Sequence, residues 1–129
     1  MDHEFLLSQS DGRPMYQQIM EQIKWRITAG EWEPGFKLPS IRELAVSTLV
    51  SVITVKRAYQ ELESEGVIFT RQGKGSFVAE VDDLGRRLQE EELELKMAEV
   101  LEMARSLGMD DHEFIKRLRD MADAKKRGN

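Results

Sequence analysis

The chain has 129 residues, of which 40% are hydrophobic and 33% are charged, and its formal net charge is −5. This composition is typical of a soluble globular protein with one domain, or one domain and a small appendage. The absence of cysteine excludes disulfides, thiolate metal sites and cysteine nucleophiles. No apolar run approaches the roughly 20 residues that cross a bilayer, so we expect a cytoplasmic protein without a membrane partner.

Charge is distributed unevenly along the chain. Residues 37–78 contain six basic and four acidic residues, whereas residues 81–129 contain ten basic and thirteen acidic ones. The basic middle is therefore the part expected to face an anionic partner. A solvated surface can carry the same asymmetry, so charge alone does not decide the function.

Helical periodicity begins after residue 13. Residues 1–13 have no sustained period and are expected to form an extended N-terminal arm. Pro14 suits the first turn of a helix, and Gly30 supplies a left-handed cap at its end. The apolar face of this helix consists of Tyr16, Ile19, Met20, Ile23 and Ile27.

Two closely spaced helices follow. Ser40 and Glu43 form the pattern of a capping box, which predicts a short helix over residues 41–47. Ser51 is expected to cap the next helix, which ends at Gly66. Together they predict a helix-turn-helix. The residues expected to face inward are Ile41, Leu44 and Ala45 in the first helix and Val55, Ala58, Tyr59 and Leu62 in the second.

The period changes after Gly66. Residues 67–70 and 76–79 are β-rich, and the segment 71–75 between them contains two glycines, which predicts a hairpin. A helix, a helix-turn-helix and a hairpin in this order make a winged helix, expected over residues 14–80.

Residues 81–129 are expected to form two helices. The first begins at Asp82 or Asp83 and ends at Gly108, and Asp110 with Glu113 predicts a capping box for the second. Two such helices bury little alone, and a second copy of the chain is the simplest partner for their leucine and methionine stripe. The predicted fold is therefore mostly α with a small β-hairpin, a winged helix-turn-helix followed by a two-helix dimerisation region.

The middle segment has the residue types of a reader of double-stranded DNA. A recognition helix places its N-terminal residues at base edges in the major groove, while basic and hydroxyl groups hold phosphates. Ser51, Thr54 and Lys56 are the polar groups at that end of the second helix. Val52 and Ile53 could contact thymine methyl groups there.

Three further positions extend this set. Arg42 can reach a guanine edge or a phosphate from the preceding helix. Gly73 and Lys74 at the hairpin tip would lie along the minor groove or the backbone. Each residue also has an ordinary explanation, since Ser51 and Thr54 can simply cap a helix and a single lysine can be a solvated charge. The ordered set carries the prediction.

Residues 14–78 closely resemble the N-terminal winged-helix domain of the GntR family of bacterial transcription regulators. The matching elements are Pro34-Gly35, Leu38-Pro39-Ser40-Ile41-Arg42-Glu43-Leu44-Ala45, Thr54-Val55-Lys56-Arg57-Ala58-Tyr59, Leu62, Gly66 and Gly73-Lys74-Gly75-Ser76-Phe77-Val78. The resemblance implies that Arg42, Ser51, Thr54, Lys56 and Gly73 contact operator DNA, with Arg57 and Lys74 on phosphates.

The short C-terminal segment resembles the YtrA subfamily, whose members carry a small dimerisation region. This resemblance implies a homodimeric repressor on a palindromic operator. The sequence departs from the family pattern at Val52 and Ile53, where polar or basic residues are frequent. It also departs at Thr48-Leu49, which replaces a commoner Leu-Gly-like turn.

Metal binding and catalysis have little support. Asp2-His3-Glu4 and Asp110-Asp111-His112-Glu113 contain ligand types, but adjacent residues on a helix do not converge, and acidic residues favour a helix N-terminus. No histidine is near a plausible nucleophilic serine in sequence, and no glycine-rich phosphate loop is present. We therefore expect no metal, no cofactor and no enzymatic activity.

Two other functions remain open at this point. A winged-helix protein-interaction module that has lost DNA binding would fit the net charge of −5 and the apolar pair Val52 and Ile53. A regulator that senses a small-molecule effector would need a site in the C-terminal helices, which Met97, Met103, Met109 and Met121 could line.

Overall fold

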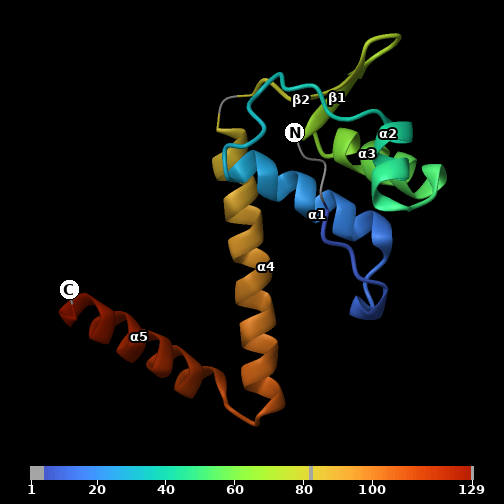
Figure 1. Ribbon diagram of the computed structural model, residues 1–129. Coiled ribbons are helices and arrows are strands. Elements are labelled where there is room, and N and C mark those ends of the chain that lie inside the picture. The colour runs from blue at the N-terminus through green and yellow to red at the C-terminus, as the bar shows by residue number, and fades with distance from the viewer. Residues whose placement is uncertain (1–4, 82, 129) are drawn as a thin grey trace. The chain divides into compact units, whose positions relative to one another are not determined.

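The computed structural model describes residues 5–81 and 83–128, and these form two compact units that divide between Gln89 and Glu90 (Figure 1). The elements in chain order are a 3-10 turn η1 (Gln9–Asp11), α1 (Met15–Thr28), α2 (Ile41–Thr48), α3 (Val52–Ser64), β1 (Ile68–Arg71), β2 (Gly75–Val78), α4 (Leu84–Ser106) and α5 (Asp111–Arg127). The predicted class, mostly helical with one hairpin, is confirmed. None of the helices in the described ranges is both long and apolar enough to cross a membrane.

The first unit is built around the buried face of α3. Val55, Ala58, Tyr59 and Leu62 have at most 3% of their surface exposed, as the helical spacing predicts. They pack in one hydrophobic cluster with the buried faces of α1 and α2, the hairpin and the first turns of α4. Leu44 and Ala45 of α2 are buried in it, and Ile41 is partly buried.

The hairpin is antiparallel, with Ile68 opposite Val78 and Phe69 opposite Phe77. The segment before α2 extends it, because the N–H of Leu38 donates to the Ser76 carbonyl at 2.8 Å. The N–H of Val78 donates back to the Phe36 carbonyl at 2.9 Å. The loop between α1 and α2 is therefore hydrogen-bonded to the wing.

The predicted caps at the end of α1 and the start of α2 are present. Ser40 and Glu43 form the complete capping box, and Gly30 has a left-handed φ of 82°. Leu49, which ends α2, is also left-handed, with a φ of 58°. A non-glycine residue pays a free-energy cost for that conformation.

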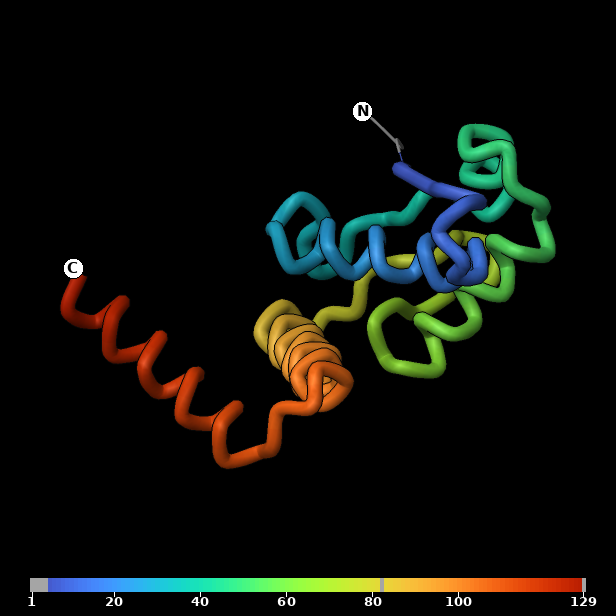
Figure 2. Tube along the Cα trace, turned by 90° about the horizontal axis from the view of Figure 1, so that it is seen from below, coloured from blue at the N-terminus to red at the C-terminus, as the bar shows by residue number. Residues whose placement is uncertain are grey.

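The N-terminal arm differs from the extended segment that we predicted. It contains the turn η1, and it runs antiparallel to α1, which Figure 2 shows in dark blue and blue. The side-chain amide of Gln18 accepts from the Ser8 N–H and donates to the Ser8 carbonyl, both at 2.8 Å. Gln22, one turn further on, makes the same pair of bonds with the backbone of Leu6.

The arm is also held at its start. The guanidinium of Arg26, only 8% exposed, lies 4.3 Å from the centre of the Phe5 ring. The contacts of Gln18 with Ser8, of Gln22 with Leu6 and of Arg26 with Phe5 join residues 10 or more positions apart, so no local period in residues 5–13 predicts them. These contacts attach the arm, which has no hydrophobic pattern of its own, to α1 of the first unit.

The second unit contains the rest of α4 and α5. Asp83 has a left-handed φ of 64° immediately before α4, while Asp82, the alternative start, lies outside the described residues. The predicted second capping box is only half formed. The Asp110 side chain accepts from the Glu113 N–H at 2.8 Å, but the Glu113 carboxylate pairs with Arg117 at 3.1 Å. An ion pair to the next turn has replaced the reciprocal bond.

The arm contacts predict a measurable role for Gln18, whose side chain is almost fully buried. Gln18→Leu keeps the size of the side chain but removes three hydrogen bonds, including one to the Arg13 carbonyl at 3.0 Å. We expect the free energy of unfolding to fall by about 1–3 kcal/mol, because backbone groups lose their partners. Urea unfolding measures it. Gln17→Leu, at an exposed neighbour, should change little, and equal losses in both variants would contradict the assignment.

Candidate nucleic-acid interface

The N-terminus of α3 combines a polar cap with two exposed apolar side chains. Ser51 Oγ accepts from the Thr54 N–H at 3.1 Å and lies 2.8 Å from Thr54 Oγ1. Ser51 is therefore the helix cap that the sequence predicts. Val52 and Ile53, in the first turn, are 46% and 80% exposed. The outer side of this turn is mainly apolar.

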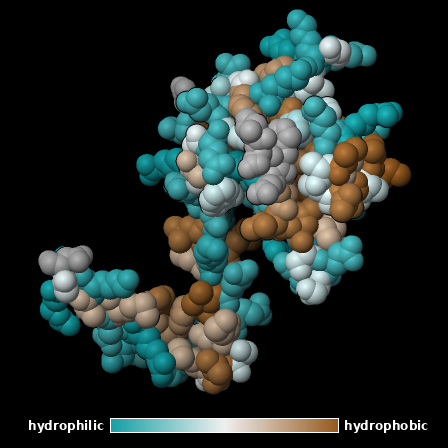
Figure 3. All heavy atoms as spheres, in the orientation of Figure 1, coloured by the Kyte–Doolittle hydropathy of each residue, from teal (hydrophilic) through white to brown (hydrophobic). Residues whose placement is uncertain are grey.

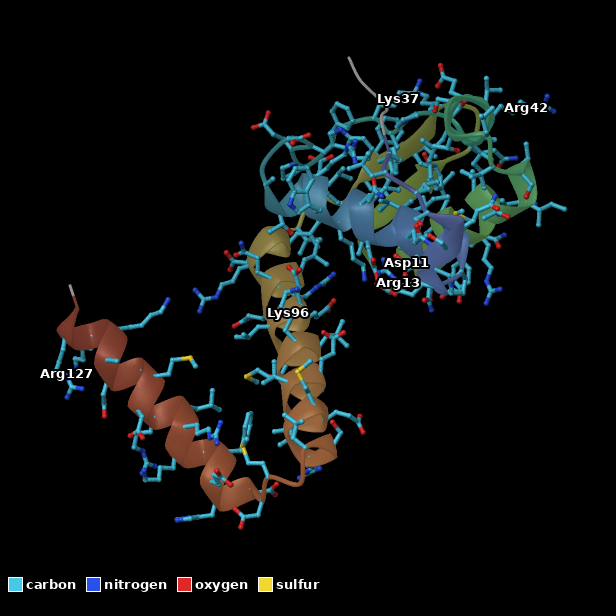
Figure 4. All side chains as sticks on the ribbon, turned by 60° about the horizontal axis from the view of Figure 1, so that its bottom comes forward. Asp11, Arg13, Lys37, Arg42, Lys96 and Arg127 are labelled. Carbon is cyan, nitrogen blue, oxygen red and sulfur yellow. The ribbon has the colours of Figure 1, made fainter. Side chains whose placement is uncertain are left out.

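Exposed basic side chains lie on α2, on α3 and on the hairpin. Arg42, on α2, extends away from the helix into open space in Figure 4, and Lys56 is exposed on α3. Lys74 is exposed in the turn of the hairpin. None of the three forms an ion pair within the described part of the chain. Their charges are available to an external anion.

Arg57 has an internal partner that the sequence did not indicate. Its guanidinium carbon lies 3.9 Å from the centre of the Tyr16 ring, and its Nη2 donates to Tyr16 Oη at 3.2 Å. We predicted Tyr16 only as part of the apolar face of α1. The two residues are 41 positions apart, and only the packing of α1 on α3 brings them together.

The hairpin presents its glycines and cations in different ways. Gly73 has a φ of 78° and open space where a side chain would stand, so its backbone is accessible for a close approach. At Gly75 a Cβ would come within 2.9 Å of Lys37 Cε, and its φ of 125° also favours glycine. The guanidinium of Arg71 lies 5.3 Å from the centre of the Phe69 ring. Arg71 and Lys37 are thus further cations at the wing, and they were absent from our candidate set.

This arrangement fits a polyanion with both charged and apolar surfaces. Cations and hydroxyl groups around a helix N-terminus can hold phosphates, and exposed side chains in the first turn can reach base edges. Within the described residues no group of acidic and histidine side chains is arranged to hold a metal ion. The ligand types at Asp2-His3-Glu4 lie outside those residues, and Asp110 caps α5.

Comparison with known proteins identifies the same region. Residues 15–78 match the model of the family described as bacterial regulatory proteins, gntR family. The HTH-type transcriptional regulator YhcF of Bacillus subtilis is 44% identical over 98 residues, which cover 73% of this chain and 78% of YhcF. The transcriptional repressor YtrA of the same organism is 38% identical over 99 residues, 77% of this chain and 72% of YtrA.

Solved structures agree with these sequence matches. A GntR family transcriptional regulator from Listeria monocytogenes superimposes with a TM-score of 0.71 at 31% identity, covering 85% of this chain and 96% of that one. The DNA-binding domain of AraR, solved in complex with operator ORE1, superimposes with a TM-score of 0.52 at 34% identity. That match covers 59% of this chain and 93% of the AraR chain.

The cap of α3 predicts a stability effect at Ser51. Ser51→Ala removes the acceptor of the Thr54 N–H and should lower the free energy of unfolding by about 1 kcal/mol. Ser51→Gly should cost only a few tenths, because glycine is also favoured at a cap. Thermal unfolding of both variants measures this, with the exposed Ser64→Ala at the other end of α3 as control. An alanine variant as stable as the wild type would contradict the cap.

Proposed function

The chain belongs to the gntR family of bacterial regulatory proteins, and from this premise we propose that it represses transcription by binding a palindromic operator as a homodimer. It is a DNA-binding transcription regulator, and regulators of the YtrA type are among its relatives. The observation that best supports the proposal is the α3 N-terminus. It exposes an ordered set of side chains beside cations that have no acidic partner among the described residues.

We assign the predicted site residues to two tasks. Base edges or their flanking phosphates would be contacted by Arg42 and by the first turn of α3. That turn contains Val52, Ile53 and Thr54, and Lys56 follows just beyond it. Arg57 and Lys74 would hold phosphates, and the wing backbone would approach the duplex at Gly73. Ser51 would contribute through the cap that orients the first turn. Most of the affinity would come from phosphate neutralisation.

The C-terminal helices support the homodimer. Within the second unit Ala104 is buried, and Leu101, Met109 and Phe114 are partly buried. Other apolar side chains there are 46–75% exposed, namely Leu93, Leu95, Met97, Val100, Met103, Leu107, Ile115, Leu118 and Met121. We propose that residues 81–129 form a dimerisation region and residues 14–80 the DNA-binding domain. A two-fold protein would then match a palindromic site.

The alternatives have less support. The relatives are transcription regulators, a role without catalysis, and we propose the same for this chain. A protein that binds operators acts on the chromosome, so we propose that it acts in the cytoplasm.

A small-molecule effector stays a prediction. An open cavity of about 390 Å³ lies in the first unit, and its lining includes Trp32 and Pro34 from the loop after α1 and Leu84 from the start of α4.

Fluorescence anisotropy on DNA from upstream of the protein's own gene tests the function. Selective binding over a scrambled duplex, with log K falling linearly with log salt, is expected, and the slope counts the phosphate contacts. Arg42→Ala should weaken specific binding by about 1–3 kcal/mol if the guanidinium makes a bidentate base contact.

Arg13→Ala is the matched control, because Arg13 is an exposed arginine of the same unit that is paired with Asp11 and Glu21. Its binding should match the wild type. Equal weakening of Arg42→Ala on all duplexes would restrict Arg42 to phosphate contact. Absence of binding by the wild type even at low salt would refute DNA recognition and favour the protein-interaction module.

The Tyr16–Arg57 contact predicts coupled effects on DNA binding. Tyr16→Ala removes the ring on which the guanidinium stacks, so it should weaken binding about as much as Arg57→Ala. The double variant should be little worse than either, with a coupling energy of about 0.5–1 kcal/mol. Tyr16→Phe keeps the stacking and should retain most of the affinity. Additive losses in the cycle would show that Tyr16 does not position Arg57.

A further inference from the structure

Leu49 combines an unfavourable backbone conformation with an almost fully exposed side chain. Its φ and ψ are 58° and 38°, and 93% of its surface is accessible. This left-handed conformation costs free energy for leucine but not for glycine. Because the side chain is exposed, its burial in the folded monomer offsets little of that cost. Residues held in such conformations cluster where a protein binds something.

Leu49 does not stand alone. It lies three residues before α3, whose first two residues, Val52 and Ile53, are also exposed. We call Leu49, Val52 and Ile53 the apolar tip. Figure 3 shows hydrophobic surface gathered over the turn that joins α2 to α3. The tip thus lies at the exposed start of α3, one turn before Val55, which is completely buried.

The polar groups of the same turn are already engaged. Ser51 Oγ accepts the Thr54 N–H, and the two hydroxyl groups lie 2.8 Å apart. Their capacity to hydrogen-bond base edges is reduced accordingly. The side chains that project freely from this turn are the apolar ones.

The charges around the tip indicate which partner covers it. Arg42 and Lys56 lie on the two helices that the tip connects, and neither is neutralised within the described residues. An apolar surface on helices that also carry such cations fits a polyanion that carries apolar groups. The apolar group that DNA presents in its major groove is the C5-methyl group of thymine.

We propose that the apolar tip reads thymine methyl groups, so that each operator half-site is defined by thymines facing the turn between α2 and α3. Leu49 becomes a specificity-determining residue beside Val52 and Ile53. This proposal rests on the proposed function, because it requires that the helix-turn-helix enters the major groove.

Deoxyuridine tests the proposal at the level of one methyl group. It pairs like thymidine and presents the same hydrogen-bonding edge without the methyl. Thymidines of the selectively bound upstream duplex are replaced one at a time, and binding is measured by fluorescence anisotropy. We expect an affinity loss of about fourfold for each methyl that the tip contacts, which corresponds to the burial of one methyl-sized group. Deoxyuridines placed outside the half-sites should leave the affinity unchanged.

Leu49→Gly separates recognition from folding. Glycine favours the backbone conformation of residue 49, so the variant should unfold at the same urea concentration as the wild type or a higher one. It should bind the thymidine duplex more weakly and lose its sensitivity to at least one of the uridine positions. Leu6→Ala, which truncates a similarly exposed leucine in the arm, should behave as the wild type.

The outcomes distinguish this proposal from the function on which it rests. Methyl recognition would be supported if the wild type binds selectively and loses affinity at certain deoxyuridine positions, and if Leu49→Gly no longer senses at least one of these positions. Selective binding that is indifferent to every uridine would overturn it and leave the DNA-binding function intact, with a protein partner as the next occupant to consider. Absence of selective binding by the wild type would overturn both.

Discussion

The buried face of α3 is the constraint on which the interface depends. Its aromatic member, Tyr59, donates a hydrogen bond of 2.6 Å to the Pro39 carbonyl, directly before the cap of α2. Burial, with the nearby carboxylate of Glu43, raises the pKa of Tyr59, so the phenol stays a protonated donor. One helix face thereby fixes both the core and the start of the preceding helix, which carries Arg42.

The direction of the binding side chains follows from this packing. A helix turns by 100° per residue, so burial of Val55 and Ala58 directs Ile53 and Lys56 away from the core, while Val52 is exposed because it stands in the first turn, one turn before Val55. The wing is coupled to the same frame, because residues 36 and 38 hydrogen-bond to β2. The interface therefore needs no separate scaffold, and its geometry is set by the hydrophobic core.

Sequence patterns predicted the parts of the fold that local chemistry determines. The caps at Ser40 and Ser51 and the helix faces depend on residues three or four positions apart, and the structure confirms them. The arm bonds of Gln18 and the stacking of Arg57 on Tyr16 depend on tertiary contacts, and no local pattern indicates them. The half-formed box at α5 shows a different limit, because two local patterns compete for one carboxylate: Glu113 pairs with Arg117 four residues on instead of bonding back to the backbone of Asp110.

The acidic character of the whole chain does not oppose a DNA partner. Several of its carboxylates are engaged inside the fold, as in the capping box of Glu43 and the 2.7 Å pair of Glu65 with Lys24. Arg42 and Lys56 have no such compensation among the described residues. Charges interact strongly only within about 10 Å at ordinary ionic strength. A duplex at α3 therefore responds to these local cations, while the acidic residues behind the net charge of −5 lie mainly outside residues 37–78, which contain only four of the 24.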